Sequence, residues 1–518
     1  MAITRALLFS MFFINLNLTM FFYLHMYQLN SYQSLSHFNW IKSRGMHDIV
    51  YRNVWLFIPI CLCFFDNFYI LAIGTFISYC MMLFINRRRK YKKPLVYTDR
   101  LTRLLGTMGI INLILTTFVI MNFSLWQACV TLTVWTFLLP VVVIIANFIN
   151  SPIEKHVNNK FIKEAKNILN EMPKLQIIGI TGSYGKTSTK YFLNKLLSTK
   201  YNVLMTPGNY NTTLGVVRTI REKLNATHEI FLCEMGARHV GDIKEICDLV
   251  KPHYGIISSI GPQHLETFFN MDNVINTKFE LADSIDDSGK VFLNYGNEYI
   301  KNKECNKNIV SYGVNVAGVN YVAENVSVSA KGSHFTVRSS KGEVQEFKTK
   351  LIGKHNVENI TGAIAVACEL GIPMEELVYP VKTLEAVPHR LELIKGNTAT
   401  IIDDAYNSNP VGAKMAVETL DCFDGCKIVI TPGMVELGSE QDRCNKEFGK
   451  QMAKVSDYIV LVGKEQTKTI YEGILSEKFD DKKVFIANSF DEGMKWIKEL
   501  KVEKEKFVLM ENDLPDNY

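Results

Sequence analysis

The stretch from Ile177 to Lys190, IIGITGSYGKTSTK, places an apolar run, a glycine loop and the start of a helix in sequence. A short apolar run of this kind is typical of a central parallel strand. Backbone N–H groups at the start of the following helix, together with the helix macrodipole, favour bound phosphate. The helix itself is indicated by apolar residues at helical spacing, which are Phe192, Leu193, Leu196 and Leu197. The stretch therefore predicts an α/β domain with a phosphate-binding loop.

Within this loop, two glycines would allow the backbone to wrap closely around a phosphate group. Lys186 is expected to contact the terminal phosphates of ATP, and Thr187 to place its hydroxyl on Mg²⁺. The general pattern G-x-x-x-x-G-K-[ST] fails, because Ile180 stands where its first glycine should be. A structural strand–turn–helix is the alternative, which the ordered elements disfavour. The residues expected to bind the nucleotide here are Gly182, Ser183, Tyr184, Gly185, Lys186, Thr187 and Ser188.

The composition of the chain changes at about residue 150. Residues 1–150 are dominated by Leu, Ile, Phe, Val and Met, whereas residues 151–518 have the mixed composition of a soluble α/β protein. Apolar segments long enough to cross a bilayer occupy residues 6–28, 54–86, 104–121 and 126–149. The second is either one long span or a hairpin, because it contains Asp66 and Asn67. We expect four or five spans; a cleaved signal peptide is disfavoured by length and by the further segments.

A basic run, RRRKYKK, follows the second apolar segment from Arg87 to Lys93. The positive-inside rule places such a run in the cytoplasm. The next two spans then go out and back, so residue 150 emerges in the cytoplasm. The chain is thus expected to be a multi-pass protein of the cell membrane with cytoplasmic catalytic domains. Nucleic-acid binding is not expected, because no aromatic or basic binding module surrounds the run and the net charge is only +5.

Strands and helices alternate from residue 175 to 385, with a strand-rich stretch at 308–350 that is expected to be antiparallel. A second alternation follows Arg390 and predicts a second doubly wound domain. The expected division is a transmembrane region at 1–150, an ATP-binding central domain at 151–388 and a Rossmann-like C-terminal domain at 389–518.

Seven further motifs follow the phosphate loop in a fixed order. They are PGNYNTTLGVV (207–217), CEMGARHVGDI (233–243), ISSIGPQHLETF (257–268), NTKFE (276–280), GKHNVENITGAIAVA (353–367), PHRLE (388–392) and IIDDAYNSNP (401–410). This set resembles the Mur ligases, ATP-dependent amide-forming enzymes of cell-wall precursor synthesis. The last motif, with PGMVELG at 432–438, is closest to the branch that adds D-alanyl-D-alanine. The resemblance covers residues 175–518.

The resemblance implies roles for residues that would be ordinary without it. Glu234 and His264 would ligate Mg²⁺ with Thr187, although a carboxylate at a strand end or a single histidine is more often structural. Lys186, His264 and Lys278 would be catalytic. Lys278 would be carbamoylated, which requires a neutral amine and therefore a depressed lysine pKa. Without the motif, Lys278 reads as a solvated helical lysine.

Other matched residues concern the nucleotide and domain closure. Asn294 resembles an adenine-contacting asparagine, but Gly296 and Asn297 stand where relatives often have an acidic residue. Arg390 and Asp404 resemble the pair through which the C-terminal domain closes over ATP. Asn445 stands where many relatives carry histidine, so no role is transferred to it.

The expected function is ATP-dependent amide ligation through an acyl phosphate, on a cell-wall peptide precursor at the cytoplasmic membrane face. D-alanyl-D-alanine is the expected added group. Apolar segments stand where relatives of this branch have a uridine-nucleotide-binding domain, which favours a lipid-linked muropeptide over a soluble one. Two alternatives stay open, a poly-γ-glutamate type of ligase and an ATP-gated membrane protein without ligase activity.

Overall fold

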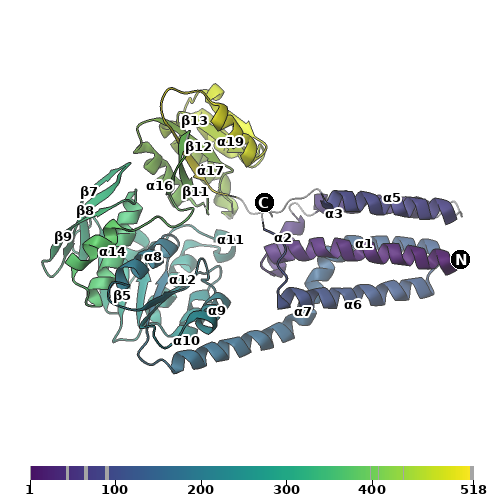
Figure 1. Cartoon of the computed structure of the whole chain (residues 1–518), viewed down its shortest axis with the longest axis horizontal. Coiled ribbons are helices and arrows are strands. Elements are labelled where there is room, and N and C mark those ends of the chain that lie inside the picture. Colours follow the sequence, from purple (N-terminus) through teal and green to yellow (C-terminus); the bar gives the residue numbers. More distant parts are fainter. Residues whose placement is uncertain are drawn as a thin grey trace. The chain divides into compact units, whose positions relative to one another are not determined.

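The computed structural model describes residues 2–42, 46–62, 68–87, 93–396, 398–406, 408–435 and 437–513 (Figure 1). The chain separates into two compact units, one up to Asn159 and one from Lys160 to Asp513. Asp66, Asn67 and most of the basic run at 88–92 lie outside the described residues.

In its described residues the first unit consists of helices joined by short connections. Its long helices α1, α5 and α6 run side by side (Figure 1), with α1 packed against the other two. Two helices, Asp99–Asn122 and Trp126–Asn170, are long and apolar enough to cross a membrane. The expected total of four or five spans stays a prediction. The elements are α1 (Ala2–Leu29), α2 (Ser34–Trp40), α3 (Met46–Asn53), η2 (Val54–Leu56), α4 (Phe57–Leu62), α5 (Phe68–Arg87), α6 (Asp99–Asn122) and α7 (Leu125–Asn170).

Helix α7 continues about twenty residues beyond the predicted end of the last apolar segment. It runs through Pro140 and Pro152. In the first unit it is tied to α6 by Arg103, whose guanidinium donates to both carboxylate oxygens of Glu154 at 2.6 and 2.9 Å. Ala165, near its other end, is fully buried in a core of the second unit. A single helix therefore leads from the apolar unit into the α/β unit.

The second unit begins with a nine-stranded sheet of order β2-β3-β1-β4-β5-β6-β7-β8-β9. The pairs from β2 to β7 are parallel, and β7–β8 and β8–β9 are antiparallel. The antiparallel edge is the one expected from residues 308–350. The strands are β1 (Gln176–Thr181), β2 (Val203–Met205), β3 (Ile230–Glu234), β4 (Tyr254–Ile257), β5 (Lys290–Asn294), β6 (Ile309–Val314), β7 (Tyr321–Ser329), β8 (Gly332–Ser339) and β9 (Val344–Thr349).

Helices cover both faces of this sheet, because strand residues alternate between two apolar cores. In β1, Ile178 joins the core under α8 and α14, whereas Ile177 joins the core under α9, α10 and α12. The helices are α8 (Lys186–Leu197), α9 (Thr213–Lys223), α10 (Asp242–Val250), α11 (Leu265–Phe268), α12 (Met271–Asp283), α13 (Glu298–Lys301), α14 (Lys354–Glu369), η4 (Met374–Leu377) and α15 (Val378–Lys382).

A second sheet of six strands follows, of order β10-β11-β15-β12-β13-β14. Only β10 is antiparallel to its neighbour, and cores lie on both faces. The expectation of a doubly wound C-terminal domain is confirmed. Its elements are β10 (Glu392–Lys395), β11 (Ala399–Asp404), α16 (Pro410–Asp421), β12 (Cys426–Thr431), η5 (Gly438–Glu440), α17 (Gln441–Val455), β13 (Tyr458–Val462), α18 (Lys468–Ser476), η6 (Asp481–Lys483), β14 (Val484–Ala487), α19 (Phe490–Glu499) and β15 (Lys506–Glu511).

Candidate functional site

The candidate site lies at the carboxyl ends of β1, β3, β4 and β5. Strand β1 lies between β3 and β4, so the chain leaves the middle of the sheet first toward one edge and later toward the other. Parallel α/β sheets bind ligands at such a switch point, outside the carboxyl ends of the strands. The phosphate loop follows β1 at this position.

The two loop glycines have positive φ angles, 150° at Gly182 and 78° at Gly185. Neither position has room for a side chain. A Cβ at Gly185 would lie 2.6 Å from Oδ1 of Asn359 on α14, and one at Gly182 would meet the side chain of Ser258. Both glycines are therefore required by backbone conformation and by close packing.

The connection after β4 holds the loop in place. The Ser183 N–H donates to the Ser259 carbonyl at 2.6 Å, and the Ser183 hydroxyl donates to the Gly261 carbonyl at 3.0 Å. The Tyr184 hydroxyl donates to the Pro262 carbonyl. The side-chain hydroxyls of Ser183 and Tyr184 thus form hydrogen bonds within the protein. A phosphate group at this loop would therefore be bound by backbone N–H groups.

Lys186 begins α8, and its ammonium group folds back over the loop. It donates to the carbonyls of Gly182 at 2.6 Å and Ser183 at 3.0 Å. Burial lowers the pKa of Lys186 to about 8; the Glu234 carboxylate opposes the shift and the Arg390 guanidinium adds to it. The positive charge is therefore held inside the loop, where a phosphate group would be bound.

Thr187 and Glu234 are brought together, as the motifs predicted. The Thr187 hydroxyl donates to Oε1 of Glu234 at 3.2 Å. The same oxygen accepts a hydrogen bond from the Asn211 side chain at 3.0 Å. Hydroxyl and carboxylate oxygens are ligands that Mg²⁺ prefers, so these two groups fit a magnesium site beside the phosphate loop.

Lys190 is a member of this site that the motifs did not indicate. Its ammonium group lies 2.9 Å from Oε2 of Glu234, and both side chains are buried. It also donates to the Gly208 carbonyl at 2.6 Å. Burial works against ionisation of Glu234, but the charges of Lys190 and Lys186 outweigh it, so the pKa of Glu234 lies below its usual value. The sequence indicates Lys190 only by its spacing. It follows Lys186 by four residues, and residues four apart on a helix share a face.

Ser188 follows Thr187 in the first turn of α8, where it is half-buried. His264 lies in the connection after β4, the same connection that holds the phosphate loop. It has a φ of 51° and precedes α11. Its carbonyl accepts the N–H groups of Thr267 and Phe268, each at 3.0 Å. The metal role of His264 stays a prediction.

Lys278 lies on α12 with only 1% of its surface exposed. Burial and the charge of Lys186 lower its pKa well below the usual value, against the opposing charges of Asp242 and Glu280. Glu280 is itself bound to the N–H groups of Gly241 and Lys244 at 2.8 and 2.9 Å. The reading of Lys278 as a solvated lysine is wrong, because the side chain is buried. The environment favours a neutral amine, which carbamoylation requires.

Asn294 ends β5 and is also buried. Its amide N–H donates to the Ser258 carbonyl at 2.9 Å, and its oxygen accepts the Gly296 N–H at 3.0 Å. Asn297 donates to the Ile260 carbonyl at 2.9 Å. These side chains tie the end of β5 to the connection that holds the phosphate loop; contact with adenine stays a prediction.

Arg390 and Asp404 lie on adjoining segments of the C-terminal domain. Oδ1 of Asp404 accepts the Leu391 N–H at 3.2 Å, and the Arg390 guanidinium lies 4.5 Å from the ring centroid of Tyr406. Burial raises the pKa of Asp404 to about 6, although the Arg390 charge opposes the shift. The Arg390 charge also adds to the lowering of the Lys186 pKa.

A second buried carboxyl group, Glu511, pairs in register with Asp404 at the ends of β15 and β11. It accepts the hydroxyl groups of Ser408 and Thr431, the latter at 3.3 Å. Burial raises the pKa of Glu511 to about 8. The motifs did not single out this residue, because a glutamate near the end of the described chain gives no sign of burial.

Asn445 has a structural role that the sequence did not reveal. Its side chain accepts the Met434 N–H at 2.9 Å and donates to the Met434 carbonyl at 3.0 Å. It thereby fixes the loop after β12, within the PGMVELG motif.

Comparison with known proteins agrees with this arrangement. Residues 180–367 match the Mur ligase middle domain, and residues 389–510 match the Mur ligase, glutamate ligase domain. The two matched stretches together cover more than half of the chain. The chain belongs to the Mur ligase family.

Among curated Mur ligases, the UDP-N-acetylmuramoyl-tripeptide–D-alanyl-D-alanine ligase of Bacillus subtilis is 33% identical over 277 residues, or 53% of this chain. The match spans 59% of that relative's length. The ligase of the same name from Escherichia coli is 29% identical over 60% of this chain and 70% of its own. A crystal structure of MurF from Acinetobacter baumannii superposes with a TM-score of 0.62 at 26% identity, covering 69% of this chain and 77% of that one.

The Lys190–Glu234 pair gives a prediction about stability. Lys190→Met would leave a buried carboxylate without its cation, which typically costs about 3–5 kcal/mol. We expect a large fall in the thermal midpoint of the full chain in detergent, measured by circular dichroism. Adding Glu234→Gln should recover much of it. Lys195→Met, an exposed position on the same helix, is the control. An unchanged midpoint in Lys190→Met would contradict the expectation.

Glu511 gives a prediction about pH. Between the unfolded pKa of 4.5 and the folded value of about 8, the folded chain holds a proton that the unfolded chain has released. This contribution to stability is complete below the unfolded pKa and is lost as the pH rises through the folded pKa. Between pH 6 and pH 8 this contribution to the free energy of unfolding should fall by roughly 2 kcal/mol.

Glu511→Gln should remove this loss, so its thermal midpoint should fall less than that of the wild type between pH 6 and 8. Glu499→Gln, at an exposed position, should follow the wild type. Parallel pH dependence of the wild type and Glu511→Gln would show that the carboxyl group is ionised in the fold.

Proposed function

We propose that this Mur ligase joins D-alanyl-D-alanine to the peptide of a cell-wall precursor, using ATP, at the cytoplasmic face of the membrane. The observation that carries the proposal is the grouping of Lys186, Thr187 and Glu234 at the switch point of the sheet. The D-alanyl-D-alanine specificity is supported by the relatives from Bacillus subtilis and Escherichia coli, whose names state it.

The proposed reaction has two steps. A carboxylate oxygen of the acceptor peptide bonds to the γ-phosphorus of ATP, while the bond from that phosphorus to the bridging oxygen breaks and ADP leaves. The amine of D-alanyl-D-alanine then bonds to the acyl carbon, the acyl C–O bond breaks, and inorganic phosphate leaves. The amine proton is released to a base or to water. No oxidant or further reactant is needed.

The residues contribute position and charge. Lys186 and the N–H groups at the start of α8 would bind the phosphates and offset the charge that develops on the transferring group. Thr187 and Glu234 would hold Mg²⁺, which neutralises phosphate charge when bound. Asn294 would contact adenine, and Arg390 and Asp404 would act as the C-terminal domain closes over the nucleotide.

The membrane location is supported by two helices long and apolar enough to span a bilayer. One of them, α7, continues into a core of the α/β unit. We propose that the acceptor is a muropeptide and favour its lipid-linked form, because a ligase tethered at the membrane meets that form at its own surface.

Turnover tests the proposal directly. The full chain in lipid nanodiscs should release phosphate from ATP in the presence of Mg²⁺, D-alanyl-D-alanine and a muropeptide, offered in lipid-linked and uridine-nucleotide forms. Lys186→Ala should lower the rate by roughly 10²-fold or more, since a group that stabilises transition-state charge is lost. Lys195→Ala, exposed on the same helix, should leave it unchanged. ATP binding without turnover on either muropeptide would exclude this function, and turnover with glutamate alone would indicate the poly-γ-glutamate type.

Carbamoylation of Lys278 is a separate expectation. A neutral, buried amine can react with CO₂ to give a carbamate and a proton. The wild-type chain in ¹³C-bicarbonate should show a carbamate NMR signal that Lys278→Arg lacks, because a guanidinium does not react in this way. Activity of the wild type should fall in CO₂-depleted buffer. The same signal in both chains would assign it to another lysine and contradict the expectation.

A further inference from the structure

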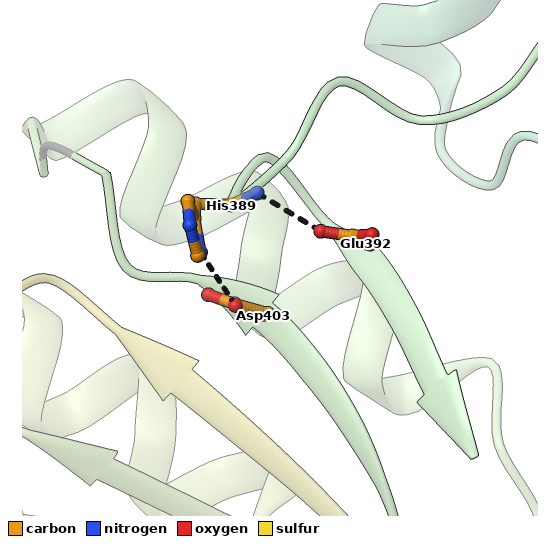
Figure 2. A group of neighbouring side chains, drawn as sticks. All are labelled: His389, Glu392 and Asp403. Atoms are coloured by element: carbon orange, nitrogen blue, oxygen red, sulfur yellow. Dashed lines mark hydrogen bonds and ion pairs between the residues drawn. The ribbon is translucent and has the colours of Figure 1, made fainter.

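The interdomain segment, residues 388–392, is tied to the end of β11 by the side chain of His389. The ring nitrogen Nδ1 of His389 lies 2.7 Å from Oδ2 of Asp403 (Figure 2). Asp403 is buried, with 3% of its surface exposed, and its other oxygen accepts the Ala405 N–H at 3.1 Å. A carboxylate can only accept, so Nδ1 carries the proton in this bond.

Neighbouring contacts make this attachment continuous. The Leu391 N–H donates to Asp404, and the Tyr406 N–H donates to the His389 carbonyl at 3.3 Å. Arg390 lies between His389 and Leu391, with its guanidinium over the Tyr406 ring. Arg390 therefore lies between two residues that hydrogen bonds hold to the end of β11.

The backbone needs these contacts. His389 has a φ of 60° and Leu391 a φ of 50°. For residues other than glycine this region is disfavoured and persists only where the surroundings hold it. The first of these two residues is held by the bond of its ring to Asp403 and by the bond of its backbone N–H to the Glu392 side chain.

We propose that His389 is a positioning residue, which through its bond to Asp403 holds Arg390 in the orientation that serves bound MgATP. The inference rests on the proposed function only in that the nucleotide is the ligand of Arg390. The Arg390 charge contributes to the lowered pKa of Lys186 in the phosphate loop, which agrees with a role of Arg390 toward the same nucleotide.

A metal site is the competing interpretation of the same residues. Ligand atoms of His389, Glu392 and Asp403 all lie within 4.8 Å of one another. Hydrogen bonds account for the arrangement without an ion. The ring of His389 bonds to Asp403, and its backbone N–H donates to the Glu392 carboxylate at 3.2 Å (Figure 2). The structure therefore favours hydrogen bonding over metal binding, and metal uptake becomes one outcome of the test.

The test is a double-mutant cycle on MgATP affinity, measured by calorimetry on the full chain in detergent. His389→Gly permits the positive φ but removes the imidazole, so it separates side-chain bonding from backbone strain. We expect His389→Gly and Arg390→Ala each to weaken MgATP binding about ten-fold. If His389 acts through Arg390, the double variant should bind as weakly as Arg390→Ala alone.

His389→Asn supplies a rescue, because asparagine tolerates this backbone region and keeps an N–H donor for Asp403. It should recover part of the affinity that His389→Gly loses. MgATP affinity is measured well below the thermal midpoint of each variant, so that a loss of affinity reports positioning of Arg390 and not unfolding.

Additive effects of the two substitutions, or wild-type affinity in His389→Gly, would overturn the proposal. Stoichiometric Zn²⁺ binding that His389→Gly abolishes would overturn it in favour of a metal site, and absent MgATP binding by the wild type would overturn it outright. MgATP binding without turnover on any muropeptide would refute the proposed function but not this proposal. The double-mutant cycle measures MgATP affinity and needs no acceptor.

Discussion

The buried ion pair between Lys190 and Glu234 is the interaction on which the arrangement of the site depends. It joins α8 to β3, and through the Gly208 carbonyl it also fixes the loop that carries Asn211. Removing two charges from water is costly unless each finds its partner and further hydrogen bonds. Both requirements are met here, so Glu234 stays ionised in a site that is otherwise rich in positive charge.

That excess of positive charge has two consequences. It suits the phosphates of a nucleotide, which bring several negative charges to Lys186. It also acts on Lys278, whose pKa is lowered by burial and by Lys186. Carbamoylation would turn the neutral amine into an anion, placing negative charge where the lysines leave a surplus. The same charges that favour ATP thus favour the chemistry proposed for Lys278.

The sequence predicted the parts of the site that depend on local order. The strand, loop and helix from Ile177 to Lys190, and the carboxylate at the end of β3, follow from chain-local patterns. The partnership of Lys190 with Glu234 depends on how α8 packs against β3, which no local pattern states. The same holds for Glu511 and Asn445, whose burial is decided by strands and helices distant in the chain. The apolar pattern predicted a span at 126–149, and it contains no sign that helix α7 continues past Pro152 to Asn170.

Three carboxyl groups, Asp403, Asp404 and Glu511, lie at the ends of β11 and β15, and each binds a different partner. If Asp403, Asp404 and Glu511 were all ionised, their repulsion would weaken every contact at this edge of the sheet. Burial and the Asp404 charge raise the pKa of Glu511 to about 8, while Asp404 titrates near 6. At neutral pH Glu511 is therefore mainly a neutral group bound by two hydroxyls. Asp403 and Asp404 accept hydrogen bonds from His389 and Leu391, so the neutral Glu511 carboxyl adds no further negative charge beside the segment that carries Arg390.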